Sequence, residues 1–308
     1  MSAPFHADVA DAPPPLRVAW LTASDGVRLR AAFWGNGAQP LVAICPGRTE
    51  MVEKYGPTVT DLTAQGFDVA VIDWRGQGLS DRLSDARLRG DVPDFADYQK
   101  DLWAYWGWLD SFSKQPRHIL AHSMGGCIAL RGLTGGLTAQ SVAFSAPMWG
   151  LNLPAATMAA VAPLTALLRL AGQDSCEVLG AGEEFELWNF PFERNELTRD
   201  PARYAWAQNQ LRTHPELRLG APSMRWLAAA LREMAALDAL PSPGLPAICG
   251  LGTGDKIISQ KAIRDRMAQW HNAKLTEYDS ALHELLMERP VVRDDFLAQC
   301  IALFLSRG

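Results

Sequence analysis

The chain has few cysteines, and none is placed for a metal site or a disulfide scaffold. Five are scattered over 308 residues, with no Cys-x-x-Cys pair and no nearby histidines at zinc-ligand spacing. They are Cys45, Cys127, Cys176, Cys249 and Cys300. This odd, scattered set predicts reduced thiols, most of them buried. A Walker pattern and a helix with paired histidines are also missing, so we expect no cofactor and no metal.

The chain also lacks a strong excess of charge of either sign. Its 29 Lys and Arg residues stand against 34 Asp and Glu residues, which gives a formal net charge of -5. A protein that binds nucleic acid needs a basic surface to pair with phosphates, so nucleic acid is not expected as a partner. The same weak negative charge provides no general attraction to an anionic membrane surface.

Segments typical of export or of membrane insertion are missing as well. The N-terminus has acidic residues and prolines where a signal peptide has a basic start and an apolar stretch. The longest apolar run, residues 151–171, contains Pro154, Pro163 and Arg169, which disfavours an uninterrupted spanning helix. We therefore expect a cytoplasmic protein, with peripheral contact at the inner membrane left open.

Short apolar runs, several of them followed by a helical pattern, dominate the remaining sequence. Runs without alternation are typical of strands that are buried on both faces of a parallel sheet. The turn signal Ser24-Asp25-Gly26 lies between the expected strands 18–22 and 28–34 and predicts an antiparallel hairpin at the edge. The expected strands are residues 18–22, 28–34, 41–45, 69–72, 118–121, 142–144, 245–250 and 274–278.

The strand pattern is interrupted between residues 147 and 222. This stretch has apolar helical segments, prolines and many aromatic residues, and strand signals resume after it. We expect a helical cap (lid) over 147–222, inserted into an α/β core formed by residues 16–146 and 223–308. Residues 1–15 are rich in Ala, Pro and Asp, and they are expected to be disordered because they offer little apolar surface to offset the entropy lost on ordering.

The candidate nucleophile lies in residues 118–130, which read as a strand, a tight turn and the start of a helix. Small residues at Ala121 and Gly125 flank Ser123, so strand and helix can approach closely while the turn exposes the serine hydroxyl. The helix N-terminus favours a developing oxyanion, and the backbone N–H of Met124 is one expected donor to it. The alternative is a serine without chemistry in an ordinary βα turn.

A serine hydroxyl needs a base in hydrogen-bond reach, and the base needs a carboxylate that orients it. Of six histidines, His283 lies in the loop after the last expected strand. Asp255 follows the strand 245–250 and is expected at the same edge, and the order Ser, Asp, His is the one used by α/β-hydrolases. Asp279, four residues before His283, is the rival for the acid.

The second oxyanion donor is expected in the loop after strand 41–45. Gly47 lets the backbone approach a substrate, so the backbone N–H of Arg48 is the candidate and Thr49 is next. For the Arg48 side chain we expect a salt bridge to Glu50 or Glu53. Binding of a phosphate or carboxylate is the alternative.

Several motifs together resemble the monoacylglycerol lipase and lysophospholipase group of the S33-like α/β-hydrolases, over almost everything after residue 16. They are Pro46-Gly47-Arg48, Glu53-Lys54-Tyr55, Asp73-Trp74-Arg75-Gly76-Gln77-Gly78-Leu79-Ser80, Ala121-His122-Ser123-Met124-Gly125-Gly126, Gly254-Asp255 and His283-Glu284. The cap also resembles the bacterial lysophospholipase-like branch, in Asn195-Glu196-Leu197-Thr198-Arg199-Asp200-Pro201, His214-Pro215-Glu216-Leu217 and Gly220-Ala221-Pro222. The resemblance implies an α/β-hydrolase fold with a mostly parallel eight-stranded sheet, a helical cap and no cofactor. It also implies ester hydrolysis through an acyl-enzyme, with the triad at Ser123, Asp255 and His283 and the oxyanion donors at Arg48 and Met124.

The apolar cap leads to the substrate expectation, since an acyl chain needs an apolar channel. We expect a single-chain lipid, either a lysophospholipid or a monoacylglycerol, and transient membrane contact through the cap. The alternatives are an esterase, thioesterase, peptidase or acyltransferase on another small acyl substrate, and a ligand-binding α/β-hydrolase without turnover.

Overall fold

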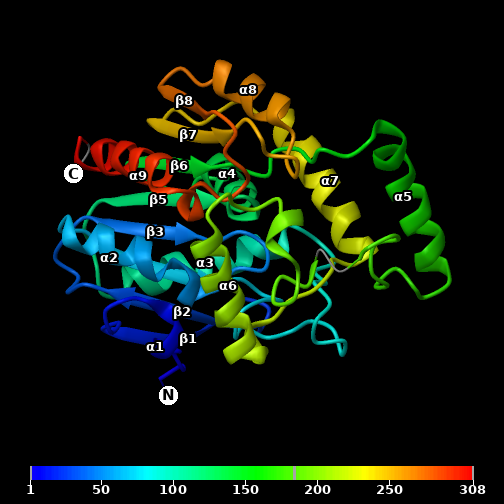
Figure 1. The fold of residues 1–308 in the computed structure, drawn as a ribbon, viewed down its shortest axis with the longest axis horizontal. Coiled ribbons are helices and arrows are strands. Elements are labelled where there is room, and N and C mark those ends of the chain that lie inside the picture. Colours follow the sequence, from blue (N-terminus) through cyan, green and yellow to red (C-terminus); the bar gives the residue numbers. More distant parts are fainter. Residues whose placement is uncertain (1, 183–184, 307–308) are drawn as a thin grey trace.

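The central element of the computed structural model, which describes residues 2–182 and 185–306, is one eight-stranded sheet (Figure 1). The strand order is β1-β2-β4-β3-β5-β6-β7-β8. β2 is antiparallel to both of its neighbours, and all pairs from β4 to β8 are parallel, which confirms the expected mostly parallel sheet with an antiparallel edge. The strands are β1 (Arg17–Thr22), β2 (Arg28–Trp34), β3 (Leu41–Cys45), β4 (Asp68–Asp73), β5 (Arg117–His122), β6 (Ser141–Ser145), β7 (Ala247–Gly252) and β8 (Ala273–Tyr278).

Helices cover both faces of this sheet, and the central strands alternate their side chains between two apolar cores. From β3, Leu41 and Ala43 enter the core shared with α3 and α4, whereas Val42 and Ile44 enter the core shared with α2 and α9. Burial on both faces explains why the strand sequences are continuously apolar. The helices are α1 (Ala7–Ala10), α2 (Gly56–Ala64), α3 (Asp97–Asp110), α4 (Met124–Thr134), α5 (Ala155–Leu170), α6 (Pro201–Thr213), α7 (Met224–Asp238), α8 (Gln260–Ala268) and α9 (Pro290–Leu305).

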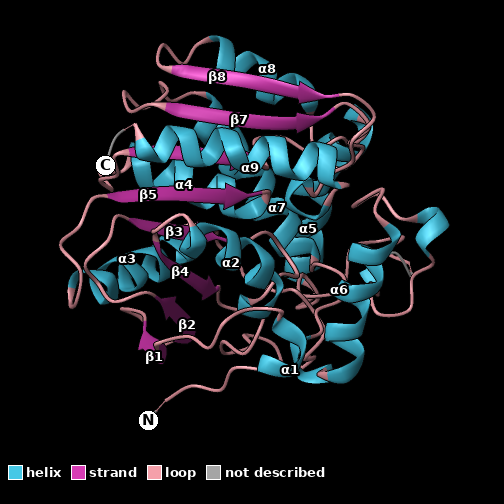
Figure 2. Ribbon diagram, turned by 60° about the vertical axis from the view of Figure 1, so that its left-hand side comes forward, coloured by secondary structure: helices cyan, strands magenta, loops and turns pink. Residues whose placement is uncertain are grey.

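The parallel strands all point the same way, so their carboxyl ends form one edge of the sheet (Figure 2). The loops that follow β3, β5, β7 and β8 leave the sheet at this edge. Loops at the carboxyl ends of parallel strands are where α/β proteins place their ligands.

The cysteines take no part in cross-links: all five are free thiols, and all but Cys176 are buried, as expected.

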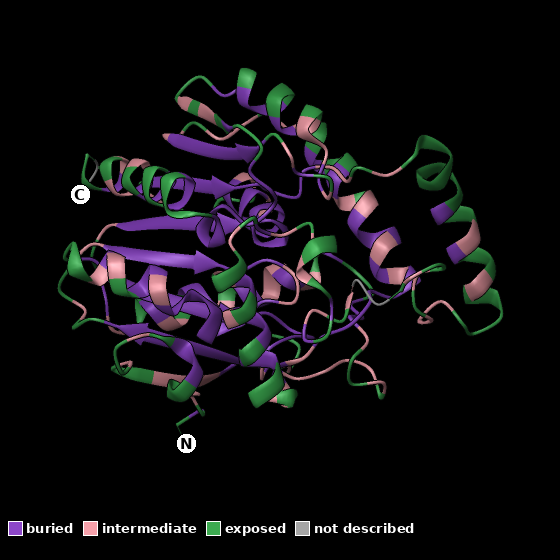
Figure 3. Ribbon diagram, viewed as in Figure 1, coloured by how far each residue is buried: buried purple, intermediate pink, exposed green. Residues whose placement is uncertain are grey.

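Residues 147–182 and 185–222 contain helices and no strand of the sheet, although the boundaries of a cap domain remain a prediction. Of these helices, α5 lies beyond the carboxyl ends of the strands and packs on α7 (Figure 1). Most of its surface faces solvent, and its buried residues are Val161 and Thr165 (Figure 3). No helix within 2–182 or 185–306 is long and apolar enough to cross a membrane.

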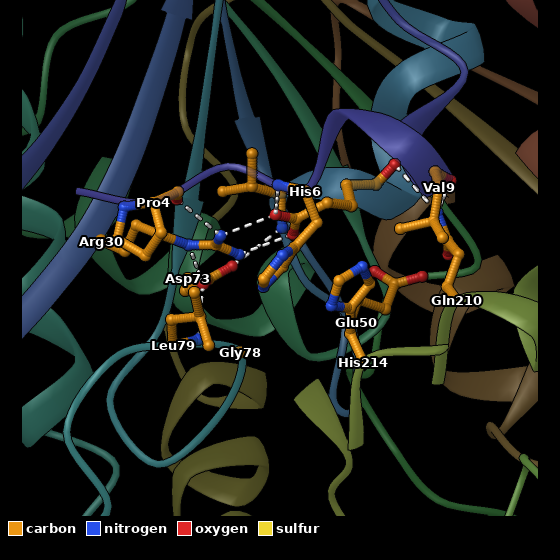
Figure 4. A network of polar contacts seen from close by, with 12 residues as sticks. Pro4, His6, Val9, Arg30, Glu50, Asp73, Gly78, Leu79, Gln210 and His214 are labelled. Atoms are coloured by element: carbon orange, nitrogen blue, oxygen red, sulfur yellow. Dashed lines mark hydrogen bonds and ion pairs between the residues drawn. The ribbon is translucent and has the colours of Figure 1, made fainter. Parts of the chain in front are cut away.

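The N-terminal segment corrects one expectation, since the described part of residues 1–15 is not a free tail. The guanidinium of Arg30 donates to the Pro4 carbonyl at 3.1 Å, and the Gln210 amide donates to the Val9 carbonyl at 2.9 Å (Figure 4). These partners are buried side chains that need an acceptor. Polar contacts to distant residues hold the segment in place, and composition alone does not reveal them.

Candidate active site

The tight turn between β5 and α4 holds Ser123 in a strained backbone conformation. Its φ is 48° and its ψ is -117°, a region that residues with a side chain rarely adopt. The turn is possible because Gly125 lies against β3: a Cβ at this position would be 2.0 Å from the Cys45 carbonyl oxygen. The strain therefore has a geometric cause, and it sets the serine at the carboxyl edge of the sheet.

The three residues predicted from different loops meet at this edge. Ser123 Oγ lies 2.9 Å from His283 Nε2, and His283 Nδ1 lies 2.7 Å from Asp255 Oδ2. All three are buried. The other oxygen of Asp255 accepts hydrogen bonds from the amides of Ile257 and Ile258 at 2.8 and 3.3 Å, which fixes the carboxylate. The arrangement is a continuous hydrogen-bonded chain from hydroxyl to carboxylate.

Asp279, the rival for the acid, lies elsewhere in this loop. Its carboxylate is exposed and contacts the hydroxyls of Thr253 and Ser280 at 3.5 and 3.3 Å. Among the described residues, no contact joins it to His283. The geometry therefore favours Asp255 as the partner of the histidine.

The pKa values of Asp255 and His283 are shifted in the directions that general-base chemistry needs. Burial on its own raises the pKa of Asp255, but the charge and hydrogen bond of His283 and the two amides outweigh burial and lower it. Burial on its own lowers the pKa of His283, but the Asp255 carboxylate outweighs burial and raises it above 6.5. A buried imidazole beside a fixed carboxylate can accept a proton and remain stable as imidazolium.

The backbone amides of Met124 and Arg48 are the predicted oxyanion donors. Met124 is the first residue of α4, so its N–H has no partner within the helix. Within the part of the chain that the structure describes, neither this N–H nor that of Arg48 donates to a protein acceptor. Thr49, the second choice for the donor, has a φ of 67°, which is unusual for a β-branched residue and marks a constrained loop.

The Arg48 side chain corrects another expectation, because it forms no salt bridge with Glu50 or Glu53. Its guanidinium donates to the Gly220 carbonyl and lies over the ring of Trp226 at 5.4 Å. The two carboxylates have other partners: Lys54 binds Glu50, and Arg30 binds Glu53. Burial lowers the pKa of Arg48 to about 10.

A buried polar cluster next to His283 was not predicted from the sequence. Lys54 Nζ lies 3.0 Å from Glu50 and 2.7 Å from Glu284, the residue after His283. The His122 ring packs against the His283 ring at 4.8 Å and bonds to the Ser145 carbonyl at 3.0 Å. The signal available in the sequence was the run of charged residues among apolar ones at positions 50–55.

Among residues 2–182 and 185–306, two groups of side chains have donor atoms close enough for a cation. In the buried group of Glu50, His122 and Glu284, the Lys54 ammonium already lies between the two carboxylates. In the other group, the rings of His6 and His214 stack face to face at 3.7 Å beside Asp8. Stacked rings do not direct their in-plane lone pairs to one point, so neither group is arranged as a metal centre.

Comparison with known proteins identifies the family. The family described as "Serine aminopeptidase, S33" (Hydrolase_4) matches residues 37–290, which is most of the chain and includes every residue of the candidate site. The chain belongs to this family. Membership in the S33 family confirms the resemblance seen in the motifs, and with it a hydrolase of the α/β serine type.

This S33 protein is similar to proteins whose names refer to lipid hydrolysis. It is 28% identical to the "Probable lysophospholipase L2" of Haemophilus influenzae over 85% of this chain and 82% of that protein. It is 29% identical to lysophospholipase L2 of Escherichia coli K12 over 86% and 80%. A soluble variant of the monoglyceride lipase from Saccharomyces cerevisiae, solved with a substrate analog, superimposes with a TM-score of 0.75, 20% identity and 99% coverage of both chains, which establishes a common fold.

Proposed function

We propose that this chain is a serine carboxylic-ester hydrolase that works through an acyl-enzyme. Ser123 is the nucleophile, His283 the general base and Asp255 the acid that orients it. The observation that carries the proposal is the hydrogen-bonded chain Ser123–His283–Asp255 at the carboxyl edge of the sheet, with distances of 2.9 and 2.7 Å. The free amides of Arg48 and Met124 bind the oxyanion.

The reaction follows from these positions. His283 Nε2 removes the hydroxyl proton while Ser123 Oγ bonds to the ester carbonyl carbon, and the carbonyl oxygen becomes an oxyanion facing the two amides. The imidazolium then gives its proton to the leaving alkoxide, and the ester C–O bond breaks to leave an acyl-serine. Water, deprotonated by the same histidine, repeats the two steps and releases the carboxylic acid.

We further propose a single-chain lipid, a lysophospholipid or a monoacylglycerol, as the substrate. The two relatives named as lysophospholipase L2 support this choice. So does the exposed apolar surface of α5 and the following loop, where Leu167, Leu170 and Leu179 are 64%, 88% and 68% exposed. Within the cap of residues 147–222, α5 and the loop that follows it then contact acyl chains and, transiently, the membrane from which the lipid comes.

The test compares wild type and Ser123→Ala on four substrates. They are palmitoyl lysophosphatidylcholine, monooleoylglycerol, p-nitrophenyl acetate and an aminoacyl p-nitroanilide. The proposal predicts turnover of at least one of the two lipids by wild type, with loss of about a thousandfold or more in the variant. Turnover of the anilide alone would replace the ester assignment with a peptidase. Turnover of the acetate without either lipid would contradict the lipid assignment.

A further inference from the structure

The loop that carries the Arg48 amide is held by three buried side chains, each bonded to a different backbone group. The Trp74 indole N–H donates to the Pro46 carbonyl at 2.9 Å, and the Gly47 N–H donates to the Glu50 carboxylate. The Gln77 amide donates to the Gly47 carbonyl at 2.8 Å. These contacts are separate from the hydrogen-bonded chain Ser123–His283–Asp255 and from the two oxyanion amides themselves.

Because peptide bonds are planar, these contacts determine the direction in which the Arg48 N–H points. In a trans peptide the C=O and the following N–H point to opposite sides. In the first peptide, the Pro46 oxygen faces Trp74 and the Gly47 N–H faces Glu50, as this rule requires. In the second, the Gly47 oxygen faces Gln77, so the Arg48 N–H must point away from Gln77.

We propose that Gln77 and Glu50 are positioning residues, which aim the Arg48 N–H at the oxyanion by fixing the peptide planes on either side of Gly47. The inference rests on the proposed function, since it assigns these residues through the Arg48 amide. Within the described part of the chain, neither side chain bonds to Ser123, Asp255 or His283.

A carboxamide is well suited to this place. The Gln77 NH2 group also donates to the Glu50 carbonyl at 2.9 Å, so its two N–H bonds hold both ends of a short loop. The side chain is 2% exposed, and water cannot easily replace it. A glutamate there would bring a carboxylate against two carbonyl oxygens, and a methionine would leave both oxygens without a donor.

Glu50 supplies a fixed negative charge behind the loop. Burial on its own raises its pKa, but the neighbouring Lys54 charge, His122, the Tyr55 hydroxyl and the Gly47 amide together lower it to about 2, so it stays ionised. Gly47 is also confined sterically, because a Cβ there would lie 2.8 Å from the His122 ring and 3.0 Å from the Glu50 carboxylate. The loop has little freedom to turn its amide elsewhere.

The experiment compares Gln77→Met with a matched control, Gln208→Met. The Gln208 amide also donates to two backbone carbonyls, those of Leu187 and Phe190, at 2.8 and 2.7 Å, and it is similarly buried. For a p-nitrophenyl ester, Gln77→Met is expected to lower kcat about 10- to 100-fold with KM changed less than about threefold. Gln208→Met is expected to keep kcat within about twofold.

A second readout separates aim from general loss of structure. An alkyl trifluoromethyl ketone bonds to the serine as a hemiketal whose oxyanion needs the same amides. Its inhibition constant is expected to rise by the factor by which kcat falls in Gln77→Met, and to stay unchanged in Gln208→Met. An unchanged kcat and inhibition constant in folded Gln77→Met would overturn the inference.

Two further controls keep the result interpretable. If circular dichroism shows that Gln77→Met is unfolded, Glu50→Gln is measured instead, with the same paired loss expected and the same contradiction if both values are unchanged. Ser123→Ala separates the two proposals. Full activity in Ser123→Ala refutes the proposed function, whereas an inert Ser123→Ala beside a fully active Gln77→Met refutes only the positioning role.

Discussion

Two regions of the molecule differ from the usual pattern of buried apolar and exposed polar groups. The carboxyl edge around Ser123 buries charged groups, whereas helix α5 exposes apolar ones. At the edge, the charged groups of Glu50, Asp255 and Glu284 are buried. On α5, Leu167 and Leu170 are 64% and 88% exposed. A buried charge costs free energy unless it is paired, and an exposed apolar cluster often marks a surface that binds a ligand or a membrane.

Under the proposed function, the two regions have different tasks. Each of the three carboxylates named above has a partner at hydrogen-bond distance, so the geometry at the edge is fixed, as the stabilisation of charge that develops during a reaction requires. The apolar side chains of α5 have no such partners and suit a ligand that is itself apolar. Substitutions at the edge should therefore affect kcat for every ester, and substitutions on α5 only the handling of lipids.

The largest expected effect comes from the acid at the edge. Asp255→Asn keeps the size of the side chain but removes the charge that holds His283 in its tautomer, and kcat is expected to fall about 10³- to 10⁴-fold. Asp279→Asn, in the exposed loop nearby, is expected to keep kcat within about twofold. Steady-state assays with a p-nitrophenyl ester check both, and a loss in Asp279→Asn equal to that in Asp255→Asn would contradict the assignment of the acid.

A smaller effect is expected from the apolar surface. Charges introduced by the double substitution Leu167→Asp/Leu170→Asp should disfavour contact with acyl chains and lower the initial rate on lysophospholipid micelles about tenfold. Hydrolysis of p-nitrophenyl acetate in solution should change less than about twofold. Val291→Asp on α9, where the side chain is 78% exposed, is the control that adds charge without touching α5. An equal loss on both substrates would break the division between the two regions.

The smallest expected effect is in the pH profile. The imidazole of His283 must be neutral to accept a proton, so kcat/KM falls as the pH drops through its pKa. Because Asp255 raises this pKa, the acid limb is expected to have its midpoint above 6.5 for both short esters and lipids. Asp255→Asn should move the residual midpoint to lower pH. A wild-type midpoint below 6.5, or one that depends on the substrate, would contradict this account.

Much of the fold was predictable because each central strand is buried on both faces and is therefore apolar along its length. The expected strand 41–45 coincides with β3, and the expected residues 118–121 lie within β5. The candidate triad was predictable for a related reason, since each of its members follows a strand at the same edge of the sheet. Ser123, Asp255 and His283 are far apart in sequence, yet topology alone brings their loops together.

What could not be predicted depends on competition between distant partners. Arg48 has two glutamates within five residues, but Lys54 and Arg30 bind them, and only the folded chain shows this. The N-terminal residues have a composition typical of disordered segments. The buried side chains of Arg30 and Gln210 nevertheless donate hydrogen bonds to their backbone carbonyls. In each case a long-range polar contact overrides the local sequence.

The central claim is that Ser123 is the nucleophile, and covalent labelling tests it most directly. Wild type, Ser123→Ala and Asp255→Asn are incubated with an alkyl fluorophosphonate, which phosphonylates an activated serine with loss of fluoride, and the modified peptide is identified by mass spectrometry. The account predicts one equivalent of label on Ser123 in wild type, much slower labelling in Asp255→Asn and none in Ser123→Ala. Stoichiometric labelling of another residue, or ester hydrolysis that survives in Ser123→Ala, would contradict it.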